Sequence, residues 1–109
     1  MGKFERDKGA RGERELANLL NKYGYDCRRG QQYCGVNGDA DVVGLPGIYI
    51  ECKRIERLNI DAAMDQASSN ASSINLFPTV FHRKNGRGWL VTMRFEDWIQ
   101  LYAESKHDV

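Results

Sequence analysis

Apolar residues recur at helical spacing in three separate parts of the chain. The first helix is expected over 11–23, before the stop signal Gly24, from the spacing of Leu16, Leu19, Leu20 and Tyr23. A second helix is expected over 60–73, capped by Asn59, from the stripe of Ile60, Ala63, Met64, Ala67 and Ala71. A short C-terminal helix, which should pack its aromatic face onto a sheet, is indicated by Phe95, Trp98, Ile99 and Tyr102. Residues 1–9 and 104–109 are predicted to be loosely ordered.

The segments between these helices alternate apolar and polar residues, which is the pattern of half-buried strands. A first strand is expected over 25–29, and a hairpin follows it. A second hairpin is expected from 77–83 and 88–94, with an Asn-Gly turn that sets His82 opposite Trp89. The order of elements predicts an α+β fold, layered α/β/α, with a central mixed sheet of about five strands flanked by helices.

The first hairpin, within 38–54, carries the most unusual chemistry. With a Pro-Gly turn at its centre, Asp41 lies opposite Glu51, and directly opposite residues have Cβ atoms roughly 4.5–5.5 Å apart. Two carboxylates this close repel each other unless a proton or a cation lies between them. Lys53 shares a face with Glu51 and adds a positive charge beside the pair. We therefore expect a metal site with an attendant lysine, in this register alone, because a one-residue slip turns Asp41 to the other face.

The totals indicate one ordinary globular domain, spanning 1–109. The chain has 109 residues, 41% of them hydrophobic, which suffices for a single modest core. It contains no apolar run of about 18 residues, and its charged N-terminus lacks the apolar segment of a secretory signal, so a cytoplasmic location is expected. Cys27, Cys34 and Cys52 lack zinc-ligand spacing and are expected to be reduced thiols.

Net charge alone does not predict nucleic-acid binding, because 16 basic residues face 15 acidic ones. Their distribution is more informative, since basic residues gather within 3–14, at 28–29, within 53–57 and within 83–87. Around an acidic cleft, these clusters would form a positive rim that suits a phosphodiester substrate. Each cluster taken alone is equally typical of a solvated protein surface.

The spacing of Asp41, nine intervening residues and then Glu51-Cys52-Lys53 resembles the motif of the PD-(D/E)XK nucleases. As in that superfamily, an apolar strand leads into the motif and a helix follows it. The small size of the chain and the early Glu13 are most similar to the archaeal and phage Holliday junction resolvases. The resemblance covers most of the chain and implies a restriction-endonuclease-like core.

The resemblance implies metal-assisted hydrolysis of DNA phosphodiester bonds. Asp41 and Glu51 would be the metal ligands, together with the backbone carbonyl of Cys52. Carboxylate ligands favour Mg²⁺ or Mn²⁺ over zinc, which prefers histidine and cysteine. Lys53 would orient or help to deprotonate the attacking water and stabilise the transition state.

Other residues are weighed beside this set. Glu13 continues the apolar stripe of the first helix, and the resemblance implies that it reaches the metal site; the alternative is an acid that merely favours a helix N-terminus. The resemblance also implies that Gln66 lies near the site, the alternative being a surface residue of its helix. Asp39 is the less favoured acid, because Asp41 begins the apolar run that follows the motif aspartate. The loop 30–38 would contact DNA, although it lacks the serine that such resolvases often carry.

Several basic residues are expected to contact DNA in an enzyme of this kind, namely Arg11, Arg28, Arg29, Arg54, Arg83, Lys84 and Arg87. A resolvase must cut two opposed strands, which implies a symmetric homodimer. The expected partners are therefore branched or duplex DNA and a second copy of the chain, with no membrane and no small-molecule cofactor. Such an enzyme would serve DNA recombination or repair in a prokaryotic or phage setting.

Three functions compete for this sequence. The first is a metal-dependent DNA endonuclease, with a junction resolvase as its leading form and flap, nicked or linear duplex DNA as other substrates. The second is a non-catalytic relative that only binds nucleic acid, and the third is an unrelated metal-binding or structural α+β domain. The intact set of Asp41, Glu51 and Lys53 favours the first, because a module that only binds DNA gains nothing from carboxylates facing phosphate.

Overall fold

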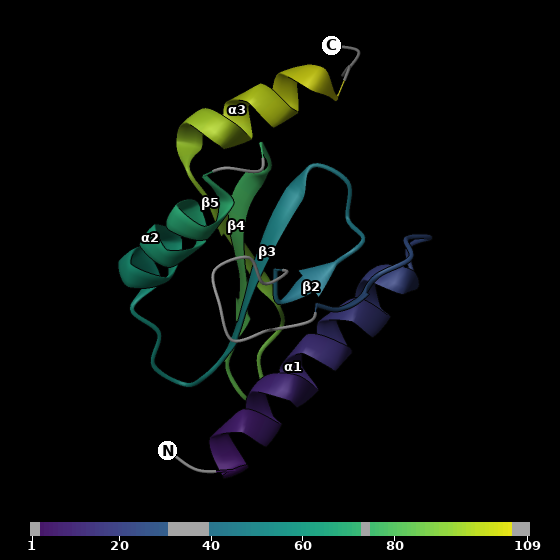
Figure 1. Ribbon diagram of the computed structural model, residues 1–109, viewed down its shortest axis with the longest axis vertical. Helices are drawn as coiled ribbons and strands as arrows, with labels where there is room; N and C mark the ends of the chain where they lie inside the picture. The colour runs from purple at the N-terminus through teal and green to yellow at the C-terminus, as the bar shows by residue number, and fades with distance from the viewer. Residues whose placement is uncertain (1–2, 31–39, 73–74, 106–109) are drawn as a thin grey trace.

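The structure, a computed structural model, describes residues 3–30, 40–72 and 75–105. Within them the chain forms, in order, α1 (Lys3–Asn21), β1 (Arg28–Arg29), β2 (Val42–Val43), β3 (Ile48–Arg54), α2 (Ile60–Ala71), β4 (Phe77–Arg83), β5 (Leu90–Met93) and α3 (Phe95–Glu104) (Figure 1). This confirms the predicted order of elements and the α+β class. Of the helices in these ranges, none combines the length and the apolar character that crossing a membrane requires.

The five strands form one sheet in the order β1-β2-β3-β4-β5. Its central pair, β3 and β4, is parallel and the other pairs are antiparallel, which confirms the predicted mixed sheet. β1 is shorter than the expected strand 25–29. The reason is that Asn21 binds both backbone groups of Cys27, accepting from its N–H (2.5 Å) and donating to its carbonyl (3.0 Å), so only Arg28 and Arg29 pair with β2.

The first hairpin has the predicted register, because Val42 of β2 pairs with Ile50 of β3. This register brings Asp41 to the position opposite Glu51. Gly44, the residue directly after β2, has a φ of +114°. A Cβ there would lie 2.2 Å from the carbonyl oxygen of Asp26, so the chain packs too closely at this point for any other residue.

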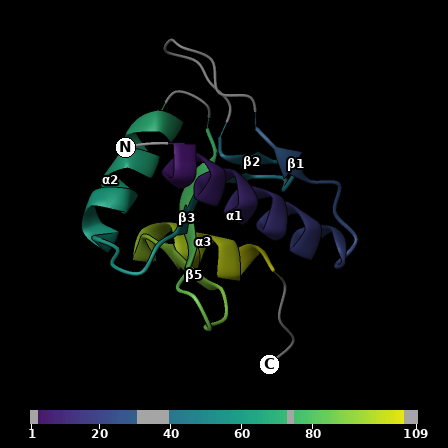
Figure 2. The same cartoon turned by 90° about the horizontal axis from the view of Figure 1, so that it is seen from below.

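Helices α1 and α2 cover opposite faces of the sheet, and Figure 2 shows them on either side of β3. Beneath α1, Leu16 packs with Ile50 and is only 1% exposed. Beneath α2, Ala67 and Val80 are fully buried. The layered α/β/α arrangement follows from these two cores on the two faces of one sheet.

The helix boundaries agree with the sequence for α2 but not for α1. The side chain of Asn59 accepts a hydrogen bond from the backbone N–H of Ala62 (3.0 Å), so the predicted cap of α2 is confirmed. α1 begins at Lys3, well before the predicted start at residue 11. Neither Gly9 nor Gly12 interrupts it, although glycine is unfavourable inside a helix.

The second hairpin differs from the prediction by one residue. His82 lies opposite Leu90, and the predicted partner Trp89 is wrong. A two-residue loop of this kind needs positive φ at both turn residues, whereas only Gly86 has it (+72°) and Asn85 does not. The loop therefore holds an extra residue, and the whole pairing of β4 with β5 shifts accordingly.

α3 does not pack its aromatic face onto the sheet, so this prediction is wrong. None of its residues is buried, and Phe95, Trp98 and Tyr102 are 66%, 46% and 46% exposed. Only Arg94 separates β5 from α3, so no loop is available to fold the helix back over a face. Figure 1 shows α3 at one end of the molecule, where Arg94 Nε donates to Ser68 Oγ of α2 (3.1 Å).

Candidate active site

The strand β3 carries Tyr49, Glu51 and Lys53 on the face that α2 covers. The side chain of Glu51 is only 6% exposed, which is unusual for a carboxylate. Burial of a charged group is unfavourable unless a partner compensates it. The buried Glu51 therefore requires a compensating partner on this face of the sheet.

Asp41 is held directly beside this strand by two hydrogen bonds. Its backbone N–H donates to the carbonyl of Ile50 (3.0 Å), and its Oδ2 accepts from the backbone N–H of Cys52 (2.8 Å). The carboxylate of Asp41 thus lies over β3, next to Glu51. The structure brings together the two acids that the sequence placed opposite each other.

The proximity of these acids changes their protonation. Burial and then the charge of Asp41 raise the pKa of Glu51 to about 7, against the opposing effect of Lys53. Burial also raises the pKa of Glu13, an effect that the hydrogen bond from Arg29 opposes and the charge of Asp41 increases. A proton on one carboxylate relieves the repulsion between the two acids. A cation bound between them would relieve it in the same way.

Lys53 is positioned by two neighbours. Its Nζ lies 3.5 Å from Glu51 Oε2 and 3.5 Å from Gln66 Oε1. Gln66 comes from α2, and its amide oxygen accepts from the ammonium group. The predicted site residues Glu51, Lys53 and Gln66 are therefore in contact, although Gln66 itself is an exposed residue of its helix.

Glu13 approaches the same carboxylates from α1. Its side chain is 14% exposed and forms an ion pair with Arg29 of β1, with 2.9 Å between Oε1 and Nε. The approach is close because Gly12 faces β3, where a Cβ on Gly12 would lie 2.9 Å from the Cβ of Arg54. The Arg29 side chain donates a hydrogen bond to Glu13. Its predicted role as a phosphate contact stays a prediction.

Sequence reasoning missed the role of Glu15. Its carboxylate binds Arg54 of β3, with 3.2 Å between Oε1 and Nε, and also forms an ion pair with Arg83 of β4. The two arginine side chains are 21% and 19% exposed. Glu15 therefore joins α1 to the ends of β3 and β4. It lies off the apolar stripe of α1, on the side where these two arginines bind it.

The donor chemistry fits a hard divalent cation. The carboxylates of Asp41 and Glu51 lie side by side, and Mg²⁺ completes its coordination with water and carbonyl oxygens. In the ranges that the structure describes, no three histidine, cysteine or acidic side chains are grouped closely enough to hold a metal ion. Burial, and then the charges of Asp41 and Glu13, raise the pKa of the Cys52 thiol, and its side chain packs against the core beneath α1.

Most of the remaining predicted residues are exposed on the surface. Arg11 is exposed on α1 and Arg28 is exposed on β1. Lys84 and Arg87 are exposed in the turn after β4 and line a large cavity there. Asp39 and the rest of the predicted DNA-contacting loop, at 31–39, fall outside the described residues.

The chain is similar in fold to a known protein. No family model matches the chain, and no curated protein does. Among solved structures the chain is similar to Hjc from Archaeoglobus fulgidus, a Holliday junction resolvase from an archaeal hyperthermophile, with a TM-score of 0.58 and 25% sequence identity. The similarity covers 79% of this chain and 72% of that one. With its mixed five-stranded sheet and three helices, the chain therefore has the PD-(D/E)XK, restriction-endonuclease-like fold in the form seen in a Holliday junction resolvase.

Proposed function

We propose that the protein is a metal-dependent DNA endonuclease of the Holliday junction resolvase type. The observation that carries this proposal is the buried Glu51, which lies against Asp41 with the ammonium group of Lys53 3.5 Å away. Strongly shifted pKa values with a specific charged partner are concentrated at functional sites. The similarity of the fold to that of Hjc supports the same class of activity.

The side chains would divide the chemistry among them. Asp41 and Glu51 would hold Mg²⁺ or Mn²⁺ together with the Cys52 carbonyl, and Glu13 would add negative charge nearby. When bound, the ion would polarise the scissile phosphate and lower the pKa of a water molecule. Lys53 would donate hydrogen bonds to the attacking water and to the phosphoryl oxygens on which negative charge grows. Gln66 would act as a positioning residue that keeps the Lys53 ammonium directed into the site.

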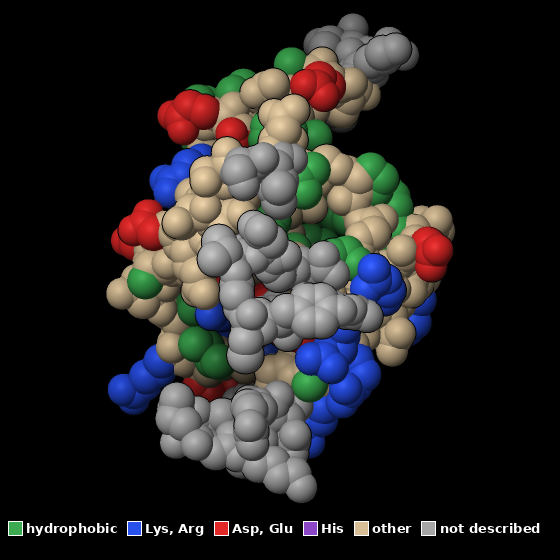
Figure 3. All heavy atoms as spheres, viewed as in Figure 1, with side chains coloured by type: hydrophobic (Ala, Val, Ile, Leu, Met, Phe, Trp, Pro, Cys, Tyr) green, Lys and Arg blue, Asp and Glu red, His purple; other side chains and the backbone are tan. Residues whose placement is uncertain are grey.

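The DNA backbone would be bound by exposed basic residues near this centre. Figure 3 shows Lys and Arg side chains gathered beside α1. Arg11 and Arg14 are exposed on this helix and border a hollow. Arg28 is exposed on the neighbouring strand. Phosphate contacts of this kind supply most of the affinity for DNA and position it without reading sequence.

A homodimer would form through the apolar face of α3, which consists of Phe95, Trp98, Ile99 and Tyr102. These side chains are between 42% and 66% exposed. At roughly 200 Å² for each aromatic side chain, they leave an apolar patch of about 400 Å² open to water, a size that marks interaction surfaces. A two-fold pairing of this face closes on itself and joins two sites in one assembly, as two opposed cuts require.

The test is cleavage of a labelled four-way junction beside linear, nicked and flapped duplexes of matching sequence, each with Mg²⁺, Mn²⁺ or EDTA. We expect paired symmetrical nicks in the junction that require the metal. Lys53→Ala should lower the rate at least about 100-fold, because the charge that stabilises the transition state is lost. Lys22→Ala, which removes an exposed lysine from the end of α1, is the matched control and should keep the rate within a few-fold.

The outcomes separate the candidate functions. Metal-dependent cutting of flaps or plain duplex, without cutting of the junction, would keep the nuclease and discard the resolvase. A folded protein that binds DNA but cuts none of these substrates in either metal would be a non-catalytic nucleic-acid-binding relative of the same fold.

A further inference from the structure

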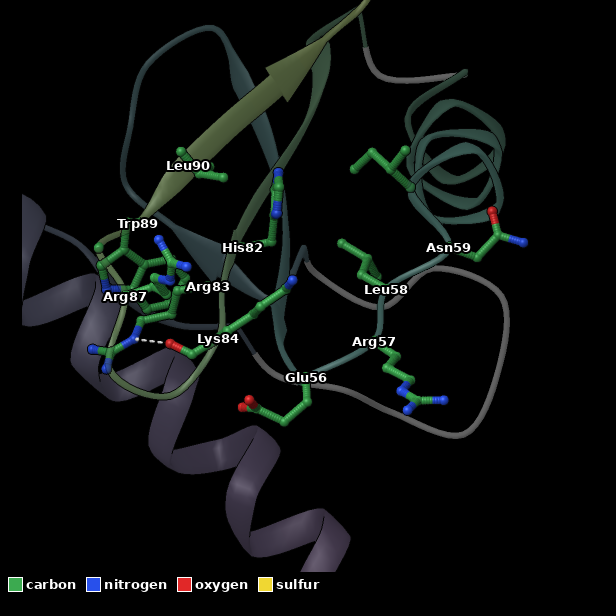
Figure 4. Close-up of a pocket in the computed structure, with 12 residues that line it drawn as sticks. Glu56, Arg57, Leu58, Asn59, His82, Arg83, Lys84, Arg87, Trp89 and Leu90 are labelled. Carbon is green, nitrogen blue, oxygen red and sulfur yellow. Dashed lines mark hydrogen bonds between the residues drawn. The ribbon is translucent and has the colours of Figure 1, made fainter.

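A cavity of about 980 Å³ opens between the β4–β5 turn and the segment that joins β3 to α2 (Figure 4). Its apolar wall consists of Leu58, Ile60, Trp89 and Leu90. Its basic residues include Arg57, Lys84 and Arg87, which are all exposed. This volume is typical of a site that encloses a small molecule or one unit of a polymer.

The cavity adjoins the candidate active site on the same face of the sheet. Lys53 of β3 pairs in register with His82 of β4, and His82 pairs with Leu90 of β5. Register partners point to the same face, so the three side chains form one row across the sheet. His82 and Leu90 line the cavity, which therefore begins one strand away from the lysine of the candidate active site.

The cavity wall is already formed without a ligand. His82 Nε2 and Thr92 Oγ1 form a hydrogen bond of 2.8 Å that fixes the imidazole ring. Burial lowers the pKa of His82, so its ring is neutral near pH 7 and suits an apolar wall. Figure 4 shows the side chain of Lys84, the residue after β4, extending towards the segment that carries Leu58.

The rim is also held in place. Asn85 N–H donates to Glu56 Oε2 (2.8 Å), which ties the β4–β5 turn to the segment after β3. Among the described residues that line the cavity, Glu56 is the single acid, and it is engaged in this bond. Arg57, Lys84 and Arg87 give the rim a net positive charge.

We propose that this cavity receives one unpaired nucleotide of the DNA, with its base against Leu58 and Leu90 and its phosphate beside Lys84 and Arg87. The proposal rests on the proposed nuclease function and adds a subsite to it. Leu58 and Leu90 offer an apolar surface to a flat base, and the cationic rim offers charge to its phosphate. Single-stranded DNA is bound without sequence preference by a comparable combination, a positive groove and side chains, there aromatic, on which the bases stack. Bases are most easily unstacked where a duplex is interrupted, so the cavity would favour substrates with an unpaired nucleotide beside the cut.

The test measures binding in EDTA, so that no cleavage occurs, by fluorescence anisotropy with three labelled duplexes. One is fully paired, one has a single unpaired adenine, and one has an abasic unit in place of that adenine. We expect about tenfold tighter binding of the duplex with the unpaired adenine than of either other duplex. Equally tight binding of the abasic duplex and of the duplex with the unpaired adenine would overturn the proposal.

Two variants on one strand sharpen this test. Leu90→Asp places a carboxylate in the cavity wall and should remove the tenfold preference while leaving binding of the paired duplex within about twofold. Val91→Asp is the matched control, because Val91 is similarly exposed (58% against 61% for Leu90) but points to the other face of β5. A preference that survives Leu90→Asp in a folded protein would overturn the proposal.

The two proposals fail in different ways. A protein that cuts DNA with metal but shows no base-dependent preference keeps the nuclease function and overturns the cavity as a nucleotide subsite. A protein that shows a Leu90-dependent preference but cuts no DNA overturns the nuclease function and supports the cavity as a DNA-binding site.

Discussion

Replacement of Glu51 by glutamine is expected to stabilise the metal-free protein at alkaline pH, whereas most changes of a buried polar residue destabilise. Burial, and then the charge of Asp41, raise the pKa of Glu51 from 4.5 to about 7. At about 1.4 kcal/mol for each pH unit, the difference corresponds to a penalty of ~3 kcal/mol on the folded state once Glu51 is ionised. Glutamine keeps the shape of the side chain and removes its charge, so the penalty disappears.

The direction of the pH effect follows from proton binding. Between pH 4.5 and about pH 7, the folded protein holds a proton on Glu51 that the unfolded chain has lost. The free energy of unfolding therefore falls as the pH rises through this range. The contribution of protonated Glu51 is complete below pH 4.5 and is lost above about pH 7. Wild type should lose up to ~3 kcal/mol through this group, and Glu51→Gln should not.

Urea denaturation in EDTA at about pH 5 and about pH 8.5, followed by tryptophan fluorescence, measures this difference. Glu104→Gln, which neutralises an exposed acid at the end of α3, is the matched control. A Glu51→Gln protein that is no more stable than wild type at the higher pH would refute the reasoning. Glu51 would then carry no uncompensated charge beside Asp41.

Addition of Mg²⁺ should offset most of the stability difference between the two proteins. An ion bound by Asp41 and Glu51 stabilises the folded wild type by mass action, by about 2.7 kcal/mol at 100 times its Kd. Glu51→Gln loses one charged ligand, so it should gain much less from the same concentration in the same assay. Equal gains for both proteins would place the ion elsewhere.

Three further substitutions test the packing of α1, the ion pairs of Glu15 and the proposed dimer. Gly12→Ala should lower Tm, because the added Cβ would lie 2.9 Å from the Cβ of Arg54. This clash should outweigh the gain of about 1 kcal/mol that alanine brings to a helix. Gly9→Ala is the control and should raise Tm, because its added Cβ would have nothing within 4 Å. Glu15→Gln weakens two ion pairs and should cost about 1 kcal/mol in urea denaturation, a loss whose absence would make both pairs energetically neutral. Trp98→Glu should convert the proposed dimer to a monomer in analytical ultracentrifugation with an unchanged circular dichroism spectrum, and a dimer that persists would exclude α3 from the interface.

The centre of the site could be predicted because its residues are close in sequence. Asp41, Glu51 and Lys53 belong to one hairpin, and alternation along a strand decides which side chains share a face. A tight turn at Gly47, which has a φ of +82°, fixes the pairing of the two strands. The stripe of α2 predicted its buried face as well, and with it the side from which Gln66 contacts Lys53.

Contacts between distant segments could not be predicted in the same way. Glu15 and Arg83 are 68 positions apart, and neither carries a local signal that names the other as its partner. The aromatic spacing of α3 predicted an amphipathic helix correctly, but amphipathicity does not say which surface covers the apolar face. The register of the second hairpin depended on the backbone angles of Asn85, which an Asn-Gly pair favours without enforcing.

The close approach of α1 to β3 determines where Glu13 lies in the candidate active site. Gly12 lies against Arg54, and the residues that follow it bind the sheet, with Glu13 contacting Arg29 of β1 and Glu15 contacting Arg54. With the contact of Glu15 to Arg83 of β4, one turn of α1 is held by three strands at once, so it moves together with its carboxylates. Displacement of that turn would carry Glu13 away from Asp41 and from the buried Glu51 of β3. Gly12→Ala is therefore expected to lower cleavage by more than its loss of stability explains, measured well below its Tm.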